Sequence, residues 1–129
     1  MPTPLLPLHL RIDDPTIPDR LLVWRVLDPI QAPVDATTGA RKIMSDVFRT
    51  EEMSVYLSDQ IALTQVQVAN PGSFVAEFPV EVIRKENSII VRDPNDYAHG
   101  LIYDALKPGE RRITRRQAHR IRNAARLIT

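Results

Sequence analysis

The sequence predicts an α+β fold, a mainly antiparallel sheet of five or six short strands closed by a C-terminal amphipathic basic helix. Short segments with strand-like patterns outnumber helical ones, and no strand–helix–strand alternation occurs. The last segment combines an N-terminal capping signal with an apolar helical arc. A chain of 129 residues, 43% of them hydrophobic, can bury one core, so residues 1–129 are expected to form a single domain.

The N-terminal third contains two predicted strands. Residues 8–12 (LHLRI) alternate apolar and polar residues, as in a half-buried strand, whereas 21–27 (LLVWRVL) form an apolar run typical of a central strand. Arg25 interrupts that run. Either Trp24 faces inward and Arg25 outward by simple alternation, or Arg25 is buried and needs a carboxylate or a ligand phosphate as its partner.

The middle of the chain predicts further short elements separated by turns. We expect strands at 53–57 (MSVYL), 62–68 (ALTQVQV) and 88–93 (SIIVRD), a turn at Asn70-Pro71-Gly72, and a short strand followed by a helical turn within 73–85. The sequence Asp93-Pro94-Asn95-Asp96 is a turn of the Asx type. A short apolar segment, 98–106, precedes the break at Lys107-Pro108-Gly109.

The C-terminal segment, 114–128, predicts an amphipathic helix. Thr114 and Gln117 have the spacing of a capping box, and Ile113 stands at the hydrophobic-staple position. On a helical wheel the apolar arc holds Ala118, Ile121, Ala124, Ala125 and Ile128, and the opposite arc holds Arg115, Arg116, His119, Arg122, Asn123 and Arg126.

Charge is unevenly distributed along the chain. Residues 1–106 carry 9 Lys/Arg and 15 Asp/Glu, a net charge of −6, whereas residues 107–129 carry 8 Lys/Arg and one Glu, a net charge of +7. The acidic, strand-rich part either neutralises the basic segment or leaves it free for an anionic partner.

The composition excludes several classes of protein. Without cysteine, the chain has no disulfide, thiolate zinc site or cysteine nucleophile. No apolar run approaches the ~20 residues needed to span a bilayer. Residues 1–14 do not match a signal peptide, because they lack a basic N-terminal region and their prolines interrupt the apolar stretch. We therefore expect a cytoplasmic protein with no membrane partner, and the sequence gives no indication of its oligomeric state.

The candidate binding residues are the basic ones of the last segment. These are Arg115, Arg116, His119, Arg122 and Arg126. One interpretation is that the apolar arc docks on the sheet while the arginines are solvated or paired with the acidic part. The others are contact with an acidic protein or with nucleic acid phosphates. No aromatic residue interrupts the basic arc, so base stacking is not indicated.

Candidate catalytic residues are few. His99, Tyr97 and Ser54 could act as a base with a hydroxyl nucleophile, but no G-x-S-x-G or phosphate-loop motif accompanies them. Asp93, Asp96 and His99 have a spacing that could gather around a cation, or they form a plain Asx turn followed by a backbone-bonded histidine. We predict no metal and no cofactor.

Several of these short motifs occur together. The segments LLVWRVLDP, IMSDVFRTEEMSVYL and IIVRDPNDYAHGLI resemble a group of small bacterial proteins without an established activity. The features that carry the resemblance are Arg25 with Pro29, Ser45 with Phe48, Met53-Ser54-Val55 and His99-Gly100. The resemblance covers about residues 22–103 and implies a compact bacterial α+β domain.

A second resemblance follows the order Arg25, Ser54 and a later glutamate. This order is similar to the order of the functional residues in NAD-using ADP-ribosyltransferase-like folds. The aromatic and glycine residues that surround those positions in such folds are absent from this sequence. This resemblance implies that Arg25 grips a phosphate of NAD, that Ser54 supports the nicotinamide ribose, and that Glu77 or Glu81 is the catalytic acid.

The sequence favours a non-enzymatic binding or adaptor domain of a bacterial complex, contacting an acidic protein partner through the helix at 114–128. The basis is a charge-segregated chain without a recognisable catalytic set. A small NAD-using enzyme or toxin, and a nucleic-acid-binding module that uses the same basic helix, remain as alternatives.

Overall fold

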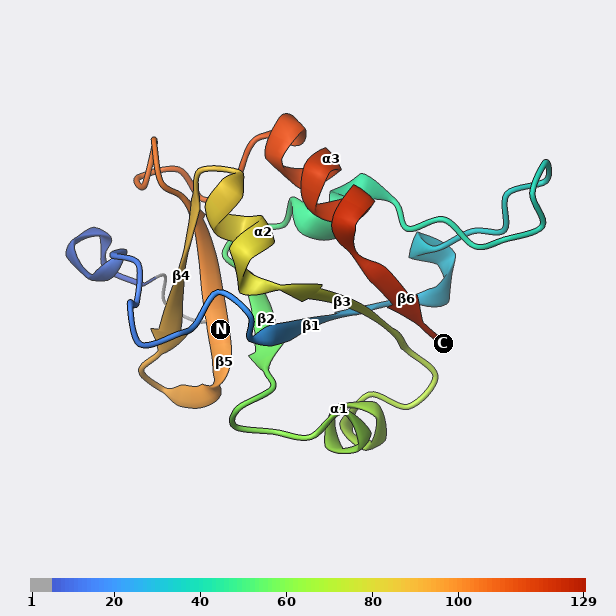
Figure 1. Cartoon of the computed structure of the whole chain (residues 1–129), viewed down its shortest axis with the longest axis horizontal. Coiled ribbons are helices and arrows are strands. Elements are labelled where there is room, and N and C mark those ends of the chain that lie inside the picture. Colours follow the sequence, from blue (N-terminus) through green and yellow to red (C-terminus); the bar gives the residue numbers. More distant parts are fainter. Residues whose placement is uncertain (1–5) are drawn as a thin grey trace.

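Six antiparallel strands form one sheet in the computed structural model, which describes residues 6–129 (Figure 1). Their order across the sheet is β4-β5-β2-β1-β3-β6. The strands are β1 (Leu22–Leu27), β2 (Met53–Leu57), β3 (Phe74–Pro79), β4 (Ser88–Asp93), β5 (Asp96–Asp104) and β6 (Arg126–Ile128). The α-helices are α1 (Leu63–Ala69), α2 (Val80–Lys85) and α3 (Arg115–Ala124), and the 3-10 helices are η1 (Leu8–Leu10), η2 (Pro29–Gln31) and η3 (Ser45–Phe48). The predicted α+β class, the antiparallel sheet and the C-terminal helix are confirmed. The first residues of the stretch compared with a signal peptide, 1–5, lie outside the described part of the chain.

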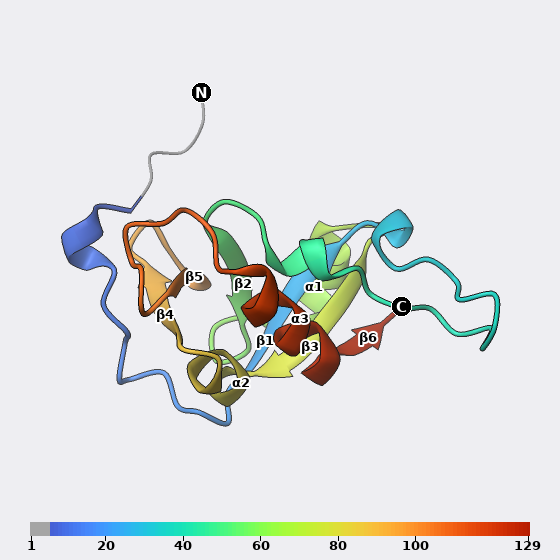
Figure 2. The same ribbon diagram turned by 90° about the horizontal axis from the view of Figure 1, so that it is seen from above.

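Helices cover both faces of the sheet. Figures 1 and 2 show α2 and α3 over one face, and α1 beneath the other. The larger core lies on the α2–α3 face and includes Val23, Leu27, Phe48, Phe78 and Ile121. A smaller core on the α1 face is formed by Trp24, Val66 and Val75. Because β1 is buried on both faces, its sequence is a continuous apolar run rather than an alternating one.

The segment 62–68 forms a helix, so its prediction as a strand is wrong. In α1, Leu63 and Val66 lie one turn apart and pack on Trp24 and Val75, whereas Val68 is 80% exposed. A strand would have placed Val66 and Val68 on the same face. The segment adopts the helical repeat rather than the two-residue repeat of a strand because a helix can pack Leu63 and Val66 on the apolar surface of β1 and β3. That surface exists only in the folded sheet.

The segment 8–12 is not a strand either. It begins with η1, and Leu8, Leu10 and Ile12 point to solvent with exposed fractions of 57%, 44% and 70%. Arg11 is buried instead: its Nε donates to the carbonyl of Leu6, and its guanidinium carbon lies 4.6 Å from the centre of the Tyr103 ring. Burial does not alternate along this segment, because His9 is exposed like the apolar residues and only Arg11 faces inward.

The helix predicted at 114–128 is shorter than expected. The capping box is present: Thr114 Oγ1 accepts from the backbone N–H of Gln117, and Gln117 Oε1 accepts from that of Thr114. The helix ends at Ala124, after which Arg126–Ile128 extend along β3 as strand β6. Without β6, β3 would be an open edge with unpaired backbone groups, and pairing satisfies them.

The other predicted elements agree with the structure. The strands at 53–57 and 88–93 are β2 and β4, and residues 73–85 contain strand β3 followed by helix α2. The Asx turn is also present, with Oδ1 of Asp93 accepting from the backbone N–H of Asn95. This turn joins β4 to β5 in a hairpin, so the segment at 98–106 belongs to the longest strand of the sheet.

Candidate functional site

Strands β1 and β2 separate along part of their length, and Arg25 lies at the separation. Their paired residues are Val23 with Leu57 and Trp24 with Tyr56, and the pairing ends there. Beyond it, Nη1 of Arg25 donates to the backbone carbonyl of Ser54 at 2.8 Å. The guanidinium of Arg25 therefore bridges the two strands where the backbone hydrogen bonds between them have ended.

Arg25 is held by oxygen atoms that carry no charge. Nε donates to the carbonyl of Val47 at 3.2 Å, and Nη2 donates to the hydroxyl of Thr50 at 2.8 Å. Within residues 6–129, no carboxylate lies within salt-bridge distance of this guanidinium. Burial lowers the pKa of Arg25 below its ordinary value. The arginine is thus a half-buried cation whose charge the described protein groups leave uncompensated.

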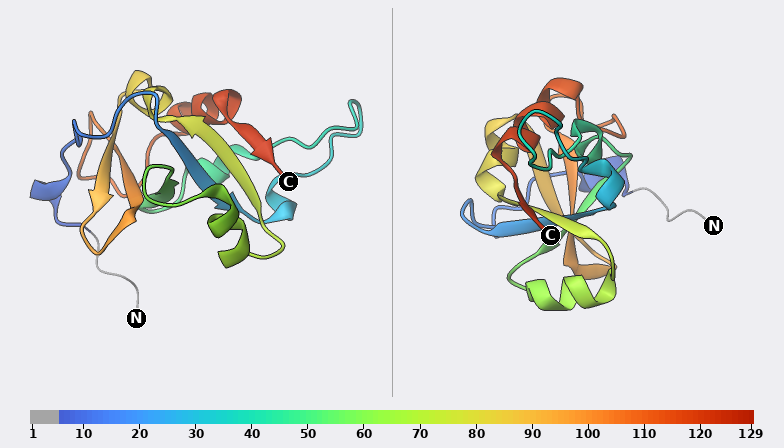
Figure 3. Two further views of the ribbon diagram at one scale, coloured as in Figure 1. Left: turned by 60° about the horizontal axis from the view of Figure 1, so that its bottom comes forward. Right: turned by 90° about the vertical axis from the view of Figure 1, so that its right-hand side faces the viewer.

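A pocket of about 210 Å³ opens at the same place. Its lining residues are Arg25, Val26, Ser54, Val55, Tyr56, Asn70 and His99. They come from β1, β2, β5 and the C-terminal end of α1. In the left-hand view of Figure 3, α1 lies below β1 and β3, and the tip of the β4–β5 hairpin lies to the left of α1.

His99 forms one wall of this pocket. It is paired with Tyr56 across the β2–β5 ladder, and the two rings meet edge to face with their centres 4.6 Å apart. Nδ1 of His99 lies 3.2 Å from Oδ2 of Asp96 at the start of the same strand. An imidazole that donates to a carboxylate from Nδ1 presents Nε2 as its free nitrogen.

Asn70 and Tyr56 add two polar groups. Nδ2 of Asn70 donates to the carbonyl of Val66 at 2.8 Å and lies 3.5 Å from the Tyr56 hydroxyl. Neither residue was among the sequence-based candidates. Tyr56 was within reach of sequence reasoning, because it alternates with Ser54 on the predicted strand at 53–57 and therefore shares its face. Asn70 was not, because its position depends on the helix that was expected to be a strand.

The catalytic candidates are only partly brought together. Arg25, Ser54 and His99 line the pocket, but its lining includes no glutamate. Glu77 lies two strands away from β2 on β3, where its Oε2 accepts from Nε1 of Trp24 and its Oε1 accepts from Arg126. Glu81 is exposed on α2 and pairs with Lys85. The constellation implied by the ADP-ribosyltransferase-like resemblance is therefore not assembled in this pocket.

The basic residues of the C-terminal segment form a second candidate site. Helix α3 packs on its own domain through Gln117, Ala118 and Ile121, which are buried. Arg115, Arg116 and His119 are exposed on the outer side, and Arg122 is half-buried with its Nη2 3.1 Å from Nδ1 of His119. We call these four residues the basic face of α3.

Four other arginines of residues 107–129 pair with carboxylates of the body, whereas Lys107 has no such partner among the described residues. Glu51 lies 3.4 Å from Arg111 and 3.8 Å from Arg112, and Glu86 lies 3.1 Å from Arg120. Arg126 is on β6 rather than on the helix and pairs with Glu77 at 2.8 Å. For the four residues of the basic face, no acidic side chain of the described chain lies within 4.0 Å. The acidic body thus neutralises part of the basic segment and leaves its helical face unpaired.

Two further properties bear on function. Across residues 6–129, no three His, Asp or Glu side chains are grouped so that they could hold a metal ion. Among the same residues, no helix has both the length and the apolar character to cross a membrane.

Comparison with protein-family models, with curated proteins and with solved structures gives no match for this chain. Its function is therefore inferred from the residues of the two sites.

Proposed function

We propose that this protein is a non-enzymatic binding domain of a cytoplasmic bacterial complex, and that the basic face of α3 contacts an acidic segment of a protein partner. The observation that supports this is the unequal pairing of the basic residues. Arg111, Arg112, Arg120 and Arg126 each lie within 4.0 Å of a carboxylate. Arg115, Arg116 and Arg122 have no such partner in the described chain, and they project from one rigid helix.

The helix supports this role because its other side is firmly held. Ala118 and Ile121 are 1% and 0% exposed within the larger core. Gln117 Nε2 donates to the carbonyls of Glu86 and Asn87 and to the carboxylate of Asp104. Arginines on a fixed helix lose less conformational freedom on binding than arginines on a mobile tail. Their planar forks match the geometry of carboxylates.

An acidic protein is favoured over nucleic acid by the size and composition of the face. Three arginines within two turns of helix would contact few phosphates, and no aromatic residue stands among them for base stacking. Carboxylates of Asp and Glu three or four residues apart on a partner helix would match their spacing.

The direct test compares two labelled probes of equal charge, a Glu-rich peptide and a short DNA duplex, by fluorescence anisotropy at about 50 mM and 200 mM salt. We expect the peptide to bind and the replacement of Arg115, Arg116 and Arg122 by Glu to abolish binding. The matched control replaces Arg20, Lys42 and Lys107 by Glu, which gives the same change of net charge at exposed positions outside α3 that have no ion pair in the described chain. Equal losses in both variants would show that only net charge matters and would contradict the proposal. Preference for the duplex, with affinity falling steeply with salt, would favour the nucleic-acid alternative.

A second readout separates function from folding. Circular dichroism and urea unfolding of the triple Arg-to-Glu variant should match the wild type, because among the described residues these three side chains make no hydrogen bond or ion pair outside α3. Loss of binding accompanied by unfolding would indicate a structural role for these arginines.

A further inference from the structure

We propose that the pocket between β1 and β2 binds a small monocarboxylate, whose carboxylate pairs with the Arg25 guanidinium. Tyr56 and Asn70 line this site from the α1 side of the sheet, whereas Arg25 alternates with Val23 and Leu27 of the larger core and reaches the pocket where β1 and β2 separate. None of the four residues of the basic face of α3 lines the pocket, so the two sites are independent. Three features of the described chain carry the proposal: the unsatisfied donors of Arg25, the charge balance around the pocket, and the size and chemistry of its walls.

The first feature is the donor capacity of Arg25. A guanidinium has five N–H groups, and the protein accepts from Nε, Nη1 and Nη2 once each. One N–H of Nη1 and one of Nη2 therefore have no acceptor within the described residues. These nitrogens form the fork that binds both oxygens of a carboxylate. A half-buried cation without a counter-ion is costly, and an anion in the adjoining pocket would compensate it.

The second feature is the charge balance, which favours a single negative charge. Among the described residues, Arg25 is the one permanently charged cation that lines the pocket. Asp96, whose carboxylate lies 3.2 Å from Nδ1 of His99, places a negative charge behind the histidine wall. A phosphate dianion would meet this carboxylate with more charge than one guanidinium balances, whereas a carboxylate matches Arg25 one to one.

The third feature is the size and polarity of the walls. A volume of about 210 Å³ is below the range of pockets for drug-sized ligands, about 300–1,000 Å³. Val26 and the ring of Tyr56 supply apolar surface, and Ser54, Asn70 and His99 supply hydrogen-bonding groups. These walls suit an acid of a few carbons with one further polar substituent, such as a 2-hydroxy acid.

The test is a titration of the whole 15N-labelled protein with acetate, propionate and lactate, followed by NMR at constant ionic strength. Chloride and inorganic phosphate are titrated in parallel. We expect lactate and propionate to shift the Arg25 Nε–H and the backbone amides of Ser54 and His99, with a dissociation constant of about 1 mM. Chloride should leave these signals unchanged. No shift with any carboxylate, or equal shifts with chloride, would overturn the proposal. Saturation by phosphate alone would overturn the assignment of the ligand as a carboxylate.

A steric variant tests the location without removing Arg25, which also joins the strands. Ser54→Leu should fill the pocket and weaken lactate binding by at least about tenfold. Ser58→Leu makes the same change at another half-buried serine that follows the same strand outside the pocket. It should leave the affinity within about twofold. Equal effects of the two variants, with both folded by their amide spectra, would show that the ligand binds elsewhere.

Discussion

The hydroxyl of Tyr103 donates a hydrogen bond of 2.8 Å to Oε2 of Glu52, which has a left-handed backbone conformation with φ of 47°. Tyr103 is fully buried, and Oε1 of the same carboxylate is a buried oxygen without a partner in the described chain. Burial raises the pKa of Tyr103 above its ordinary value, and the hydrogen bond to Glu52 and the negative charge of Glu52 raise it further. The backbone N–H of Leu6 also donates to Oε2 of Glu52, at 3.2 Å. The bond from the Tyr103 hydroxyl is therefore the shorter of two hydrogen bonds to this oxygen.

Replacing Tyr103 by Phe should therefore lower the free energy of unfolding by about 1–3 kcal/mol, because the buried carboxylate loses a donor that water cannot replace. Urea unfolding measures this. Tyr97→Phe is the control, since Tyr97 is 64% exposed and should change stability little. Equal stability of Tyr103→Phe and wild type would show that the bond contributes nothing net.

Arg25→Lys should destabilise the protein although it conserves the charge. Lysine cannot reach the carbonyls of Val47 and Ser54 and the hydroxyl of Thr50 together, because it lacks the planar fork. We expect a loss of about 2 kcal/mol in urea unfolding. Arg20→Lys at an exposed position should be neutral. If Arg25→Lys left the free energy of unfolding unchanged, the three hydrogen bonds of the guanidinium would not be what holds β1 and β2 together where they separate.

Gly100→Ala should destabilise by about 1–3 kcal/mol through overpacking. A β-carbon at Gly100 would lie 3.0 Å from Cδ1 of Ile90 and 3.0 Å from Cδ2 of Leu57, both in the larger core. Gly109→Ala is the matched control, since no atom lies within 4 Å of the position that a β-carbon would take there. Thermal unfolding of both variants would reveal the difference, and equal midpoints would indicate that the core adjusts freely around Gly100.

Gln117→Ala should loosen α3. Its Nε2 donates to the carbonyls of Glu86 and Asn87 and to Oδ1 of Asp104, and its Oε1 caps the helix. Removal of these groups should cost about 2 kcal/mol, since it leaves a buried carboxylate and a helix N-terminus short of partners. Gln67→Ala, exposed on α1, should cost nothing measurable. Faster amide hydrogen exchange confined to α3 and its contacts on α2 and β5 would identify the cause.

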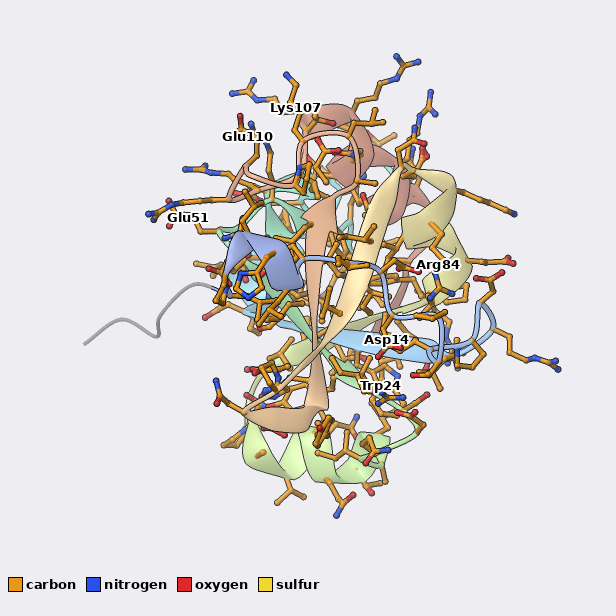
Figure 4. All side chains as sticks on the ribbon, turned by 90° about the vertical axis from the view of Figure 1, so that its left-hand side faces the viewer. Asp14, Trp24, Glu51, Arg84, Lys107 and Glu110 are labelled. Atoms are coloured by element: carbon orange, nitrogen blue, oxygen red, sulfur yellow. The ribbon has the colours of Figure 1, made fainter. Side chains whose placement is uncertain are left out.

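The contribution of Asp14 to the free energy of unfolding should be lost at acid pH. Burial opposes ionisation of Asp14, but hydrogen bonds from Thr16 and the charges of Arg92 and Arg84 outweigh it, so its pKa lies below the ordinary value of 3.8. Figure 4 shows Asp14 and Arg84 on the same side of the molecule. The folded state therefore binds this proton less readily than the unfolded state. The stabilisation is fully present well above pH 3.8 and is lost as the pH falls through the lower folded value.

The measurement is the difference in free energy of unfolding between wild type and Asp14→Asn at pH 6, and again at about pH 3. We expect the difference to shrink at the lower pH. Asp35→Asn serves as the control because Asp35 is a loop residue without an ion pair in the described chain. A difference that stays constant with pH would contradict a lowered pKa for Asp14.

Sequence patterns predicted the elements that residue periodicity or local hydrogen bonding specifies. The strand at 53–57 followed from alternation, the strand at 88–93 followed from a short strand-like run ended by a turn, and the Asx turn at Asp93 followed from local hydrogen bonding. The capping box of Thr114 and Gln117 was equally local and is present. In the pocket, sequence reasoning named Arg25, Ser54 and His99 but missed Tyr56 and Asn70.

The sequence by itself determined the fold class, the basic character of the C-terminal segment and the start of its helix, because periodicity, net charge and capping need only neighbouring residues. The tertiary structure alone decided that 62–68 is helical, that Arg11 faces inward, and that Arg126–Ile128 join the sheet. It also decided which arginines find carboxylates and which do not. Each of these outcomes depends on a surface or a charge contributed by residues distant in the chain, which exists only once the sheet has formed.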